Sequence, residues 1–595
     1  MAPYQAPLRD MQFVLRELAG LDEISKLPGF EEAAGVADPV LAEAASFAAG
    51  VLDPINQSGD KEGCTWRDGA VTTPKGFKEA YAQFARAGWI GLAVPPEHGG
   101  QGLPALLSGA TLEMWNAANV GFANGPLLNQ GAIEAIELIG SDDQKKQFIP
   151  KLVSGEWTGT MCLTEPQAGS DLAQVRTKAV PDGDHYRVTG QKIFITFGEH
   201  DMAANIIHLV LARLPDAPQG TKGISMFIVP KFLIGPAGEL GERNDVQCAG
   251  IEHKLGLNAN PTCTLNYGEH GGAIGYLIGK PNEGLKNMFI MMNAARFSVG
   301  VQGLAIADRA YQSALRYAKE RVQSRDIASR SPEPRPIIEH PDVRRMLMMM
   351  KAQLEAMRAL AYVTAASLDL SAKHPDAAVR QANRAFLELM IPVVKGWCTE
   401  TAVEICSMAV QVFGGIGYVE ETGIAQQYRD VRITTIYEGT TGIQALDLVG
   451  RKIAQDMGAT AKSVISQMRK DADGPIGPDL AKALASLSET SDWIGMTAMG
   501  DLHAAVACSV PYLKLWGITA GGWQMARAAK IAQEKIAAGD AEAEFYKAKL
   551  ATAKFYAAHI LSQTASLARE VIDGSADVMT LSQTQFDLDR KGAIA

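Results

Sequence analysis

The sequence predicts a mainly α-helical chain with a central β-barrel and an added helical domain at its C-terminus. Apolar residues recur at helical spacing before residue 157, short β-rich runs fill residues 158–280, and the helical period returns from about Leu285. We therefore predict an N-terminal helical extension (1–37), a helical domain (38–157), a β-barrel (158–280), a helical bundle (281–458) and a C-terminal helical extension (459–595).

A short amphipathic helix is predicted at the start of the chain. Four apolar residues recur at helical spacing there, and a glycine follows them as a stop signal. These residues are Leu8, Met11, Leu15, Leu18 and Gly20. The next domain alternates helical patterns with glycine and proline punctuation, which is densest between Gly88 and Leu103.

The middle of the chain has the pattern of short strands. Residues 185–188 alternate polar and apolar side chains, Gly190-Gln191 suits a tight turn, and residues 192–197 form a second β-rich run. Two further runs, 206–212 and 223–229, follow in the same style. The pattern favours a compact antiparallel sheet or barrel.

The rest of the chain is predicted to be helical. The methionines between residues 346 and 350 suit either a flexible binding surface or ordinary core filling, and we favour the core. The last block, 459–595, has helical spacing but no constellation of catalytic residues.

Composition excludes several classes of function. The 595 residues carry a net charge of -10 and a pI near 5.6, which argues against nucleic-acid binding. Seven cysteines form no C-x-x-C pair, so we predict no metal site and a reducing, cytoplasmic location. We expect no signal peptide and no apolar run of membrane-spanning length.

Two segments near the predicted barrel suit a ligand site. Residues 161–171 combine glycine, serine and threonine, which let backbone N–H groups and hydroxyls approach a ligand closely. A polar turn at a domain boundary explains the same segment equally well. Residues 192–198 contain Phe194 and Thr196, which could cover and hydrogen-bond a flat ring, although an ordinary core strand is the simpler interpretation.

The segment 428–441 contains a candidate general base. Glu438 lies between Tyr437 and Gly439, and apolar surroundings disfavour the charged form of a carboxylate and raise its basicity. Gly439 leaves the backbone bare, so that a substrate carbonyl could accept hydrogen bonds from N–H groups. Taken alone, the segment is better explained as a glutamate at a helix N-terminus that Thr440 caps.

Four ordered segments together closely resemble the acyl-CoA dehydrogenase family, over nearly the whole chain. They are the Gly-Trp and Pro-Glu-x-Gly-Gly-x-Gly loop at 88–103, the Thr-Glu-Pro-x-Ala-Gly-Ser-Asp segment at 163–171, Gln-Val-Phe-Gly-Gly-Ile-Gly-Tyr at 411–418 and Ile-Tyr-Glu-Gly-Thr at 436–440. The resemblance implies a helical domain, a β-barrel and a helical bundle, with FAD as the cofactor.

The resemblance also implies which residues bind FAD. Leu163, Thr164 and Ser170 would meet the flavin or its diphosphate, and Phe194, Ile195 and Thr196 would lie beside the flavin ring. Further contacts would come from Arg321, Gln323, Gln411, Phe413, Gly414 and Gly415, acting on the FAD of a neighbouring subunit, and from Thr440 and Gly442. An arginine suits a diphosphate because its planar fork donates two charge-assisted hydrogen bonds.

By the same resemblance, Glu438 removes the α-proton of an acyl-CoA thioester. Some members place the base near residue 295 instead, and Ala295 is not ionisable here. Arg296 matches an active-site arginine, and Ser170, Asn293 and Gly439 are implied substrate contacts.

The sequence departs from the family pattern at three positions. Phe194 stands where tryptophan is common, Phe197 where asparagine is frequent, and Asn293 where an acid is frequent.

Both termini extend beyond the usual family length. They resemble the long bacterial subfamily that includes 3-methylmercaptopropionyl-CoA dehydrogenase, which implies either a fatty acyl-CoA or that thioether thioester as substrate. The implied product is the trans-2-enoyl-CoA, and the implied electron acceptor is electron-transfer flavoprotein. We expect a homodimer, and an acyl-CoA oxidase or a non-catalytic scaffold of the same fold remain alternatives.

Overall fold

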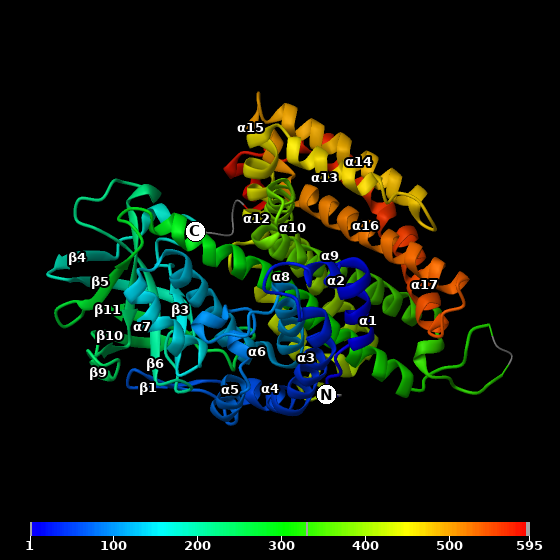
Figure 1. Cartoon of the computed structure of the whole chain (residues 1–595). Coiled ribbons are helices and arrows are strands. Elements are labelled where there is room, and N and C mark those ends of the chain that lie inside the picture. The colour runs from blue at the N-terminus through cyan, green and yellow to red at the C-terminus, as the bar shows by residue number, and fades with distance from the viewer. Residues whose placement is uncertain (1–2, 329–330, 591–595) are drawn as a thin grey trace. The chain divides into compact units, whose positions relative to one another are not determined.

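The computed structural model describes residues 3–328 and 331–590. The chain folds as two compact units. Unit 1 comprises residues 1–9, 22–317 and 405–434, and unit 2 comprises residues 10–21, 318–404 and 435–595. Figure 1 labels many of the helices and strands of both units.

Unit 1 combines long helices with the strands of the barrel. Its principal helices are α3 (Ala33–Phe47), α4 (Asn56–Glu62), α5 (Phe77–Arg86), α6 (Ala105–Ile139), α7 (Asp142–Val153), most of α8 (Gly284–Glu320) and α11 (Ile424–Val431). A two-stranded hairpin, β1 (Thr65–Arg67) with β2 (Ala70–Thr72), lies between α4 and α5 in the chain.

Within the described residues, ten strands follow α7. They are β3 (Trp157–Cys162), β4 (Lys178–Asp182), β5 (His185–Thr196), β6 (Asn205–Arg213), β7 (Ile224–Pro230), β8 (Phe232–Ile234), β9 (Leu240–Arg243), β10 (Val246–Ile251), β11 (Thr262–Tyr267) and β12 (Ala273–Ile278). β8 and β9 form a separate antiparallel pair, and the other eight strands form one sheet. Pairing runs from β5 through β12, β7, β6 and β4 back to β5, so the predicted barrel closes.

Two details of the predicted strands are wrong. β3 pairs with β6 in parallel, because the chain crosses over through β4 and β5 before it reaches β6. Gly190 makes no turn but lies inside the continuous strand β5. A Cβ at Gly190 would lie 2.5 Å from the hydroxyl of Thr177, so the glycine permits a close approach of the backbone.

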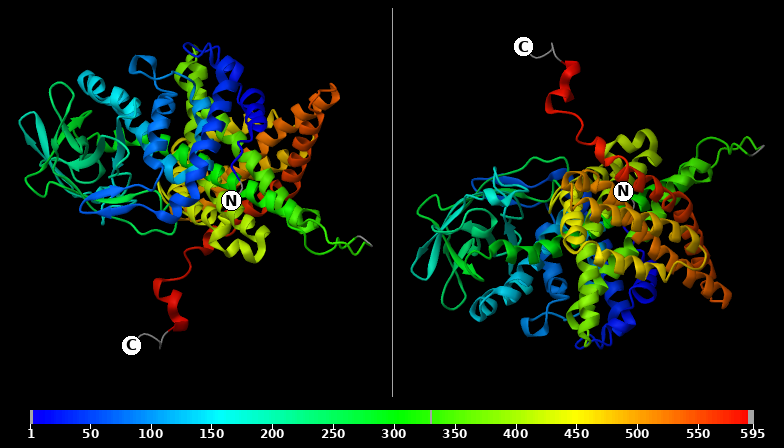
Figure 2. Two further views of the ribbon diagram at one scale, coloured as in Figure 1. Left: turned by 90° about the horizontal axis from the view of Figure 1, so that it is seen from below. Right: turned by 90° about the horizontal axis from the view of Figure 1, so that it is seen from above.

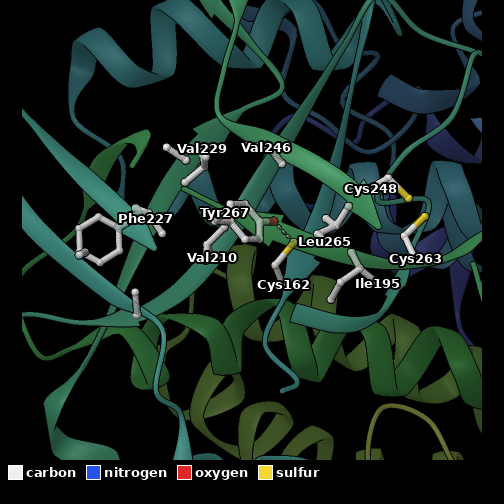
Figure 3. Close-up of a cluster of buried hydrophobic side chains, with 14 of the residues drawn as sticks. Cys162, Ile195, Val210, Phe227, Val229, Val246, Cys248, Cys263, Leu265 and Tyr267 are labelled. Carbon is white, nitrogen blue, oxygen red and sulfur yellow. Dashed lines mark hydrogen bonds between the residues drawn. The ribbon is translucent and has the colours of Figure 1, made fainter. Parts of the chain in front are cut away.

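The barrel has an apolar core, which Figure 3 shows in close-up. Fifteen buried residues form this cluster, among them Val188, Ile195, Phe227 and Leu265. The hydroxyl of Tyr267 is fully buried there and lies 3.3 Å from the sulfur of Cys162. A buried polar atom inside this cluster is therefore satisfied within the barrel itself.

Unit 2 is helical. It contains α9 (Pro341–Lys373), most of α10 (Ala377–Phe413), α12 (Thr441–Asp447), α13 (Ala459–Arg469), α14 (Gly477–Thr497), α15 (Leu502–Ala507), α16 (Ser509–Ala537), α17 (Ala543–His559) and α18 (Thr564–Ile572). Figure 2 shows the segment after α18 extending away from these helices. Met346, Leu347 and Met350 on α9 are buried, which confirms core packing for those members of the methionine-rich run.

The predicted N-terminal helix is confirmed as α1 (Leu8–Phe13) followed by a π-helical turn, Val14–Leu18, and Gly20 then takes a φ of 73°. Two stretches, Ala33–Glu62 and Gly284–Glu320, are long and apolar enough to cross a membrane, contrary to our expectation. This is weak evidence for a span, because a core helix of a soluble protein passes the same test. All seven cysteines are free thiols.

Candidate active site

A buried ion pair organises the predicted flavin-binding segment in unit 1. The chain leaves β3 at Leu163, and the carbonyl of Leu163 accepts a hydrogen bond of 2.9 Å from Lys192. Lys192 also donates to Glu165 at 2.8 Å, and the two side chains are 0% and 3% exposed. Glu165 further accepts hydrogen bonds from the backbone of Arg176 and Thr177 at 2.7 and 3.0 Å. One carboxylate therefore fixes both ends of the loop between β3 and β4.

The protonation states of this pair follow from burial and charge. Burial opposes ionisation of Glu165, but the charge of Lys192 and the hydrogen bonds to the carboxylate outweigh it and lower the pKa of Glu165 to about 2. Burial also lowers the pKa of Lys192, against the attraction of Glu165. The ion pair of Glu165 and Lys192 therefore stabilises the structure of the loop and does not serve as a proton donor or acceptor.

A β-bulge turns Phe194 out of the barrel. Along β5, Lys192 pairs with Leu265 and Ile195 pairs with Cys263, so two residues of β5 face one residue of β11. Phe194 takes a φ of 58° in this bulge, and the residue is 59% exposed. Ile195 points into the apolar core, so a contact between Ile195 and a flavin would use its backbone.

The residues around this bulge suit a flat aromatic cofactor. The ring of Phe194 is exposed, and the hydroxyl-bearing residues Thr164 and Thr196 are only partly buried. Gly169 and Ser170 are exposed, and a Cβ at Gly169 would meet no atom within 4 Å. An accessible aromatic face, open backbone and several hydroxyls are the groups that the ring and phosphates of FAD require.

Three predicted residues lie on α8. Arg296 is buried, with its guanidinium 5.9 Å from the ring centroid of Phe289. Asn293 is exposed and Ala295 is buried. Position 295 therefore offers no proton acceptor on the described helix.

The segment 411–415 ends α10 and begins a 3-10 turn, Gly414–Tyr418. Gln411, Gly414 and Gly415 are exposed, whereas the ring of Phe413 stacks on Tyr317 at a centroid distance of 4.4 Å. In unit 2, Arg321 and Gln323 are also exposed, and their side chains share a hydrogen bond of 3.0 Å.

Glu438 lies on a left-handed turn in unit 2. Its φ is 56°, and that of Gly439 is 92°. A left-handed conformation costs a residue with a Cβ about 1–2 kcal/mol, so this turn must be held by its surroundings. Thr440 caps α12 through its hydroxyl, which accepts a hydrogen bond from the N–H of Ile443 at 3.3 Å. The helix-terminus interpretation is thus correct for Thr440, and Glu438 lies just before the cap.

Sequence reasoning missed the residues that support these segments. Glu165 and Lys192 belong to motifs that we named, but no pattern indicated that they pair. Lys395 and Gln444 are 0% exposed and hydrogen-bond the backbone at Glu438 and Gly439. A single lysine in the apolar stretch 391–398 was the available signal, because a buried ammonium requires partners.

Four family models match the chain. They are described as the acyl-CoA dehydrogenase N-terminal domain (residues 38–156), middle domain (160–269) and C-terminal domain (282–453), and as an acetyl-CoA dehydrogenase C-terminal like domain (453–582). Together they match most of the chain.

Curated relatives match over almost their whole length. The chain is 46% identical to a 3-methylmercaptopropionyl-CoA dehydrogenase of Ruegeria pomeroyi, over 97% of this chain and 100% of that one. It is 35% identical to a broad-specificity linear acyl-CoA dehydrogenase of Mycobacterium tuberculosis, over 98% and 100%. An acyl-CoA dehydrogenase from Bacillus anthracis, solved in complex with FAD, shares the fold with a TM-score of 0.75 and 20% identity, over 95% of this chain and 92% of that one.

Proposed function

The chain belongs to the acyl-CoA dehydrogenase family, and on that premise we propose that Glu438 is the base that removes the α-proton of an acyl-CoA thioester. The protein is an oxidoreductase that uses FAD. The product of the proposed reaction is the trans-2-enoyl-CoA.

The observation that best supports this assignment is the left-handed backbone conformation of Glu438. A carboxylate on a strained, left-handed turn is a feature that clusters at functional sites, where the surrounding structure maintains the strain. Glu438 is partly buried, beside the exposed side chain of Ile436 and the partly buried Tyr437. A partly accessible carboxylate is the kind of group that serves as a general base.

Removal of the α-proton also requires a polarised thioester carbonyl. We assign the N–H of Glu438 as one donor to that carbonyl, with Gly439 leaving the backbone accessible. Ser170, Asn293 and Arg296 are the remaining proposed substrate contacts. The exposure of Ser170 and Asn293 is compatible with ligand contact.

FAD, when bound, supplies the acceptor for the hydride that leaves the β-carbon. The residues proposed to hold it are Leu163, Thr164, Ser170, Phe194, Ile195, Thr196, Thr440 and Gly442. Phe194 would cover one face of the ring, and Thr196 would hydrogen-bond its edge.

A homodimer would complete each flavin site with residues of a second copy. The residues that we propose to contact the FAD of the second copy are Arg321, Gln323, Gln411, Phe413, Gly414 and Gly415. All of them are exposed except Phe413, whose ring stacks on Tyr317. Light scattering tests this assembly. A monomer would contradict the shared flavin site, and a tetramer would contradict the proposed dimer.

The proposed substrate is 3-methylmercaptopropionyl-CoA, because the relative of that name is 46% identical over 97% of the chain. Linear fatty acyl-CoA is the second candidate, because a relative named for broad specificity toward it is 35% identical. A series of kcat/KM values over linear acyl-CoA lengths, with 3-methylmercaptopropionyl-CoA included, decides between them. A maximum at a linear chain would contradict the first candidate.

We propose electron-transfer flavoprotein as the acceptor and a cytoplasmic location, which the seven free thiols support. Dye reduction and peroxide production distinguish a dehydrogenase from an oxidase. Stoichiometric peroxide on addition of acyl-CoA would contradict the dehydrogenase assignment. A flavoprotein that acyl-CoA does not bleach under anaerobic conditions would instead indicate a non-catalytic scaffold.

A further inference from the structure

Two fully buried polar side chains in unit 2 hold the turn that carries Glu438. Lys395, on α10, donates a hydrogen bond of 2.7 Å to the carbonyl of Gly439. Gln444, on α12, donates to the carbonyls of Glu438 and Gly439 at 3.1 and 3.2 Å. Both Lys395 and Gln444 are 0% exposed. Neither side chain has a role in the proton transfer proposed above.

These contacts explain how the strained turn persists. Two consecutive residues have positive φ angles, 56° at Glu438 and 92° at Gly439. The angle is unfavourable at Glu438, because Glu438 carries a Cβ and Gly439 does not. An ammonium donates a stronger hydrogen bond than a neutral group, and it does so most effectively away from water. The carbonyl of Gly439 accepts from both Lys395 and Gln444, so the two side chains act on the same peptide group.

Fixing these carbonyls also fixes the direction of Glu438. Each peptide unit is planar, and the described chain contains no cis peptide bond. Holding the carbonyl of Glu438 therefore sets the peptide plane that follows its Cα, and so constrains the direction of the Cα–Cβ bond from which the carboxylate extends. A catalytic group misplaced by about 1 Å can lose on the order of a hundredfold in rate.

We propose that Lys395 and Gln444 are positioning residues that hold the turn of Glu438 and Gly439 in its reactive conformation. The inference rests on the proposed role of Glu438 as the base. The chain contains a suitable control in Lys549, another buried lysine of unit 2, which binds Asp10 and Glu355 instead of this turn. Lys549→Met and Lys395→Met each remove one buried lysine side chain, but only Lys395→Met removes a hydrogen bond to the carbonyl of Gly439.

The experiment compares wild type, Lys395→Met, Gln444→Met, the double variant and Lys549→Met. The rate of anaerobic flavin reduction at saturating acyl-CoA, the acyl-CoA dissociation constant and the melting temperature are measured for each. We expect Lys395→Met and Gln444→Met to slow flavin reduction about 10- to 100-fold, less than the loss of a direct transition-state donor. Their acyl-CoA dissociation constants should change less than threefold, and their effects should be less than additive because both act on one peptide group.

Lys549→Met should lower the melting temperature while flavin reduction stays within twofold of wild type. A second readout is the infrared carbonyl band of a bound 2-enoyl-CoA labelled with ¹³C at the thioester. Its shift from the free ligand should shrink in Lys395→Met and be retained in Lys549→Met.

The outcomes separate this inference from the proposed function. If wild type bleaches normally and both Lys395→Met and Gln444→Met reduce flavin at the wild-type rate, the positioning role is wrong and the base assignment stands. Equal slowing in Lys395→Met and Lys549→Met would likewise overturn it, since general destabilisation would then be the cause. Wild type that does not bleach with any acyl-CoA would refute the proposed function itself.

Discussion

Removing the carboxylate of Glu165 is expected to destabilise the barrel and loosen the flavin-binding segment. Glu165 and Lys192 are 3% and 0% exposed, so water cannot solvate the ammonium once its partner is lost. Besides Lys192, Glu165 accepts hydrogen bonds from the side chains of Gln167 and Thr177 and from the backbone of Arg176 and Thr177. Glu165→Gln keeps the size of the side chain but removes the charge.

The pKa of Glu165 falls from 4.5 to about 2, which corresponds to about 3 kcal/mol of stability at neutral pH. Because this pKa is lowered by folding, the contribution is present above pH 4.5 and is lost as pH falls toward 2. Breaking a buried ion pair by removing one partner costs about 3–5 kcal/mol. We therefore expect Glu165→Gln to lose about 3–4 kcal/mol.

The lysine makes the prediction sharper. The pKa of Lys192 is lowered because burial outweighs the attraction of Glu165, so a buried ammonium without its carboxylate is the most costly state. The double variant Glu165→Gln/Lys192→Met removes that ammonium. It should therefore be more stable than Glu165→Gln alone.

Urea unfolding followed by far-ultraviolet circular dichroism measures these differences, and flavin fluorescence measures FAD release in the same samples. Glu156→Gln is the matched control, because Glu156 pairs with Lys151 on the surface, where a pair contributes less than about 1 kcal/mol. Glu165→Gln within 1 kcal/mol of wild type would refute the reasoning. So would a double variant less stable than Glu165→Gln.

Three further predictions concern the flavin face, the pH dependence of unit 1 and the charge network of unit 2. Phe194→Ala should weaken FAD binding about fivefold, because the exposed ring contributes about 1 kcal/mol of aromatic contact. Phe194→Trp should retain FAD binding, and equal FAD dissociation constants of Phe194→Ala and wild type in fluorescence titration would contradict this. Burial and the charge of Asp60 raise the pKa of Asp430 from 3.8 to about 7, so stability that is present below pH 3.8 is lost as pH rises through 7. Urea midpoints between pH 4 and 8 should therefore depend less on pH in Asp430→Asn than in wild type, and an unchanged slope would count against this assignment. Asp10→Asn should lower the free energy of unfolding in urea by about 3–5 kcal/mol, because Asp10 binds the buried Lys549 and Arg358. The control is Glu544→Gln, which removes an exposed ion pair and should cost less than about 1 kcal/mol. An equally small loss in Asp10→Asn would show that the network contributes little.

The overall architecture was predictable because it depends on the period of apolar residues. The change from helical to strand spacing near residue 158, and back near residue 285, marks the barrel and the helices on either side of it in the chain. Gly190 shows the limit of this reasoning. Its sequence context suits a turn, but the requirement for glycine comes from Thr177, which lies just before β4 and approaches the backbone of β5.

The identities of the candidate site residues were predictable from ordered sequence motifs. Their exposure and backbone conformation were not, because these depend on contacts with distant parts of the chain. Phe194 could be named from its motif, but its exposure depends on a bulge that is set by pairing with β11. Glu438 could be named too, but its left-handed backbone depends on Lys395 and Gln444. Lys395 lies 43 residues before Glu438 in the sequence, and no local pattern connects the two. A contact between residues so far apart in the sequence can be identified only from the folded structure.

Anaerobic flavin bleaching in Glu438→Gln tests the central claim most directly. The flavoprotein is mixed with 3-methylmercaptopropionyl-CoA, or with the best linear acyl-CoA, and the flavin absorbance is followed over time. Wild type should bleach, and Glu438→Gln should bind FAD and acyl-CoA yet bleach at least about a thousandfold more slowly, because an amide cannot accept the α-proton. Bleaching of Glu438→Gln at the wild-type rate would contradict the assignment of Glu438 as the base.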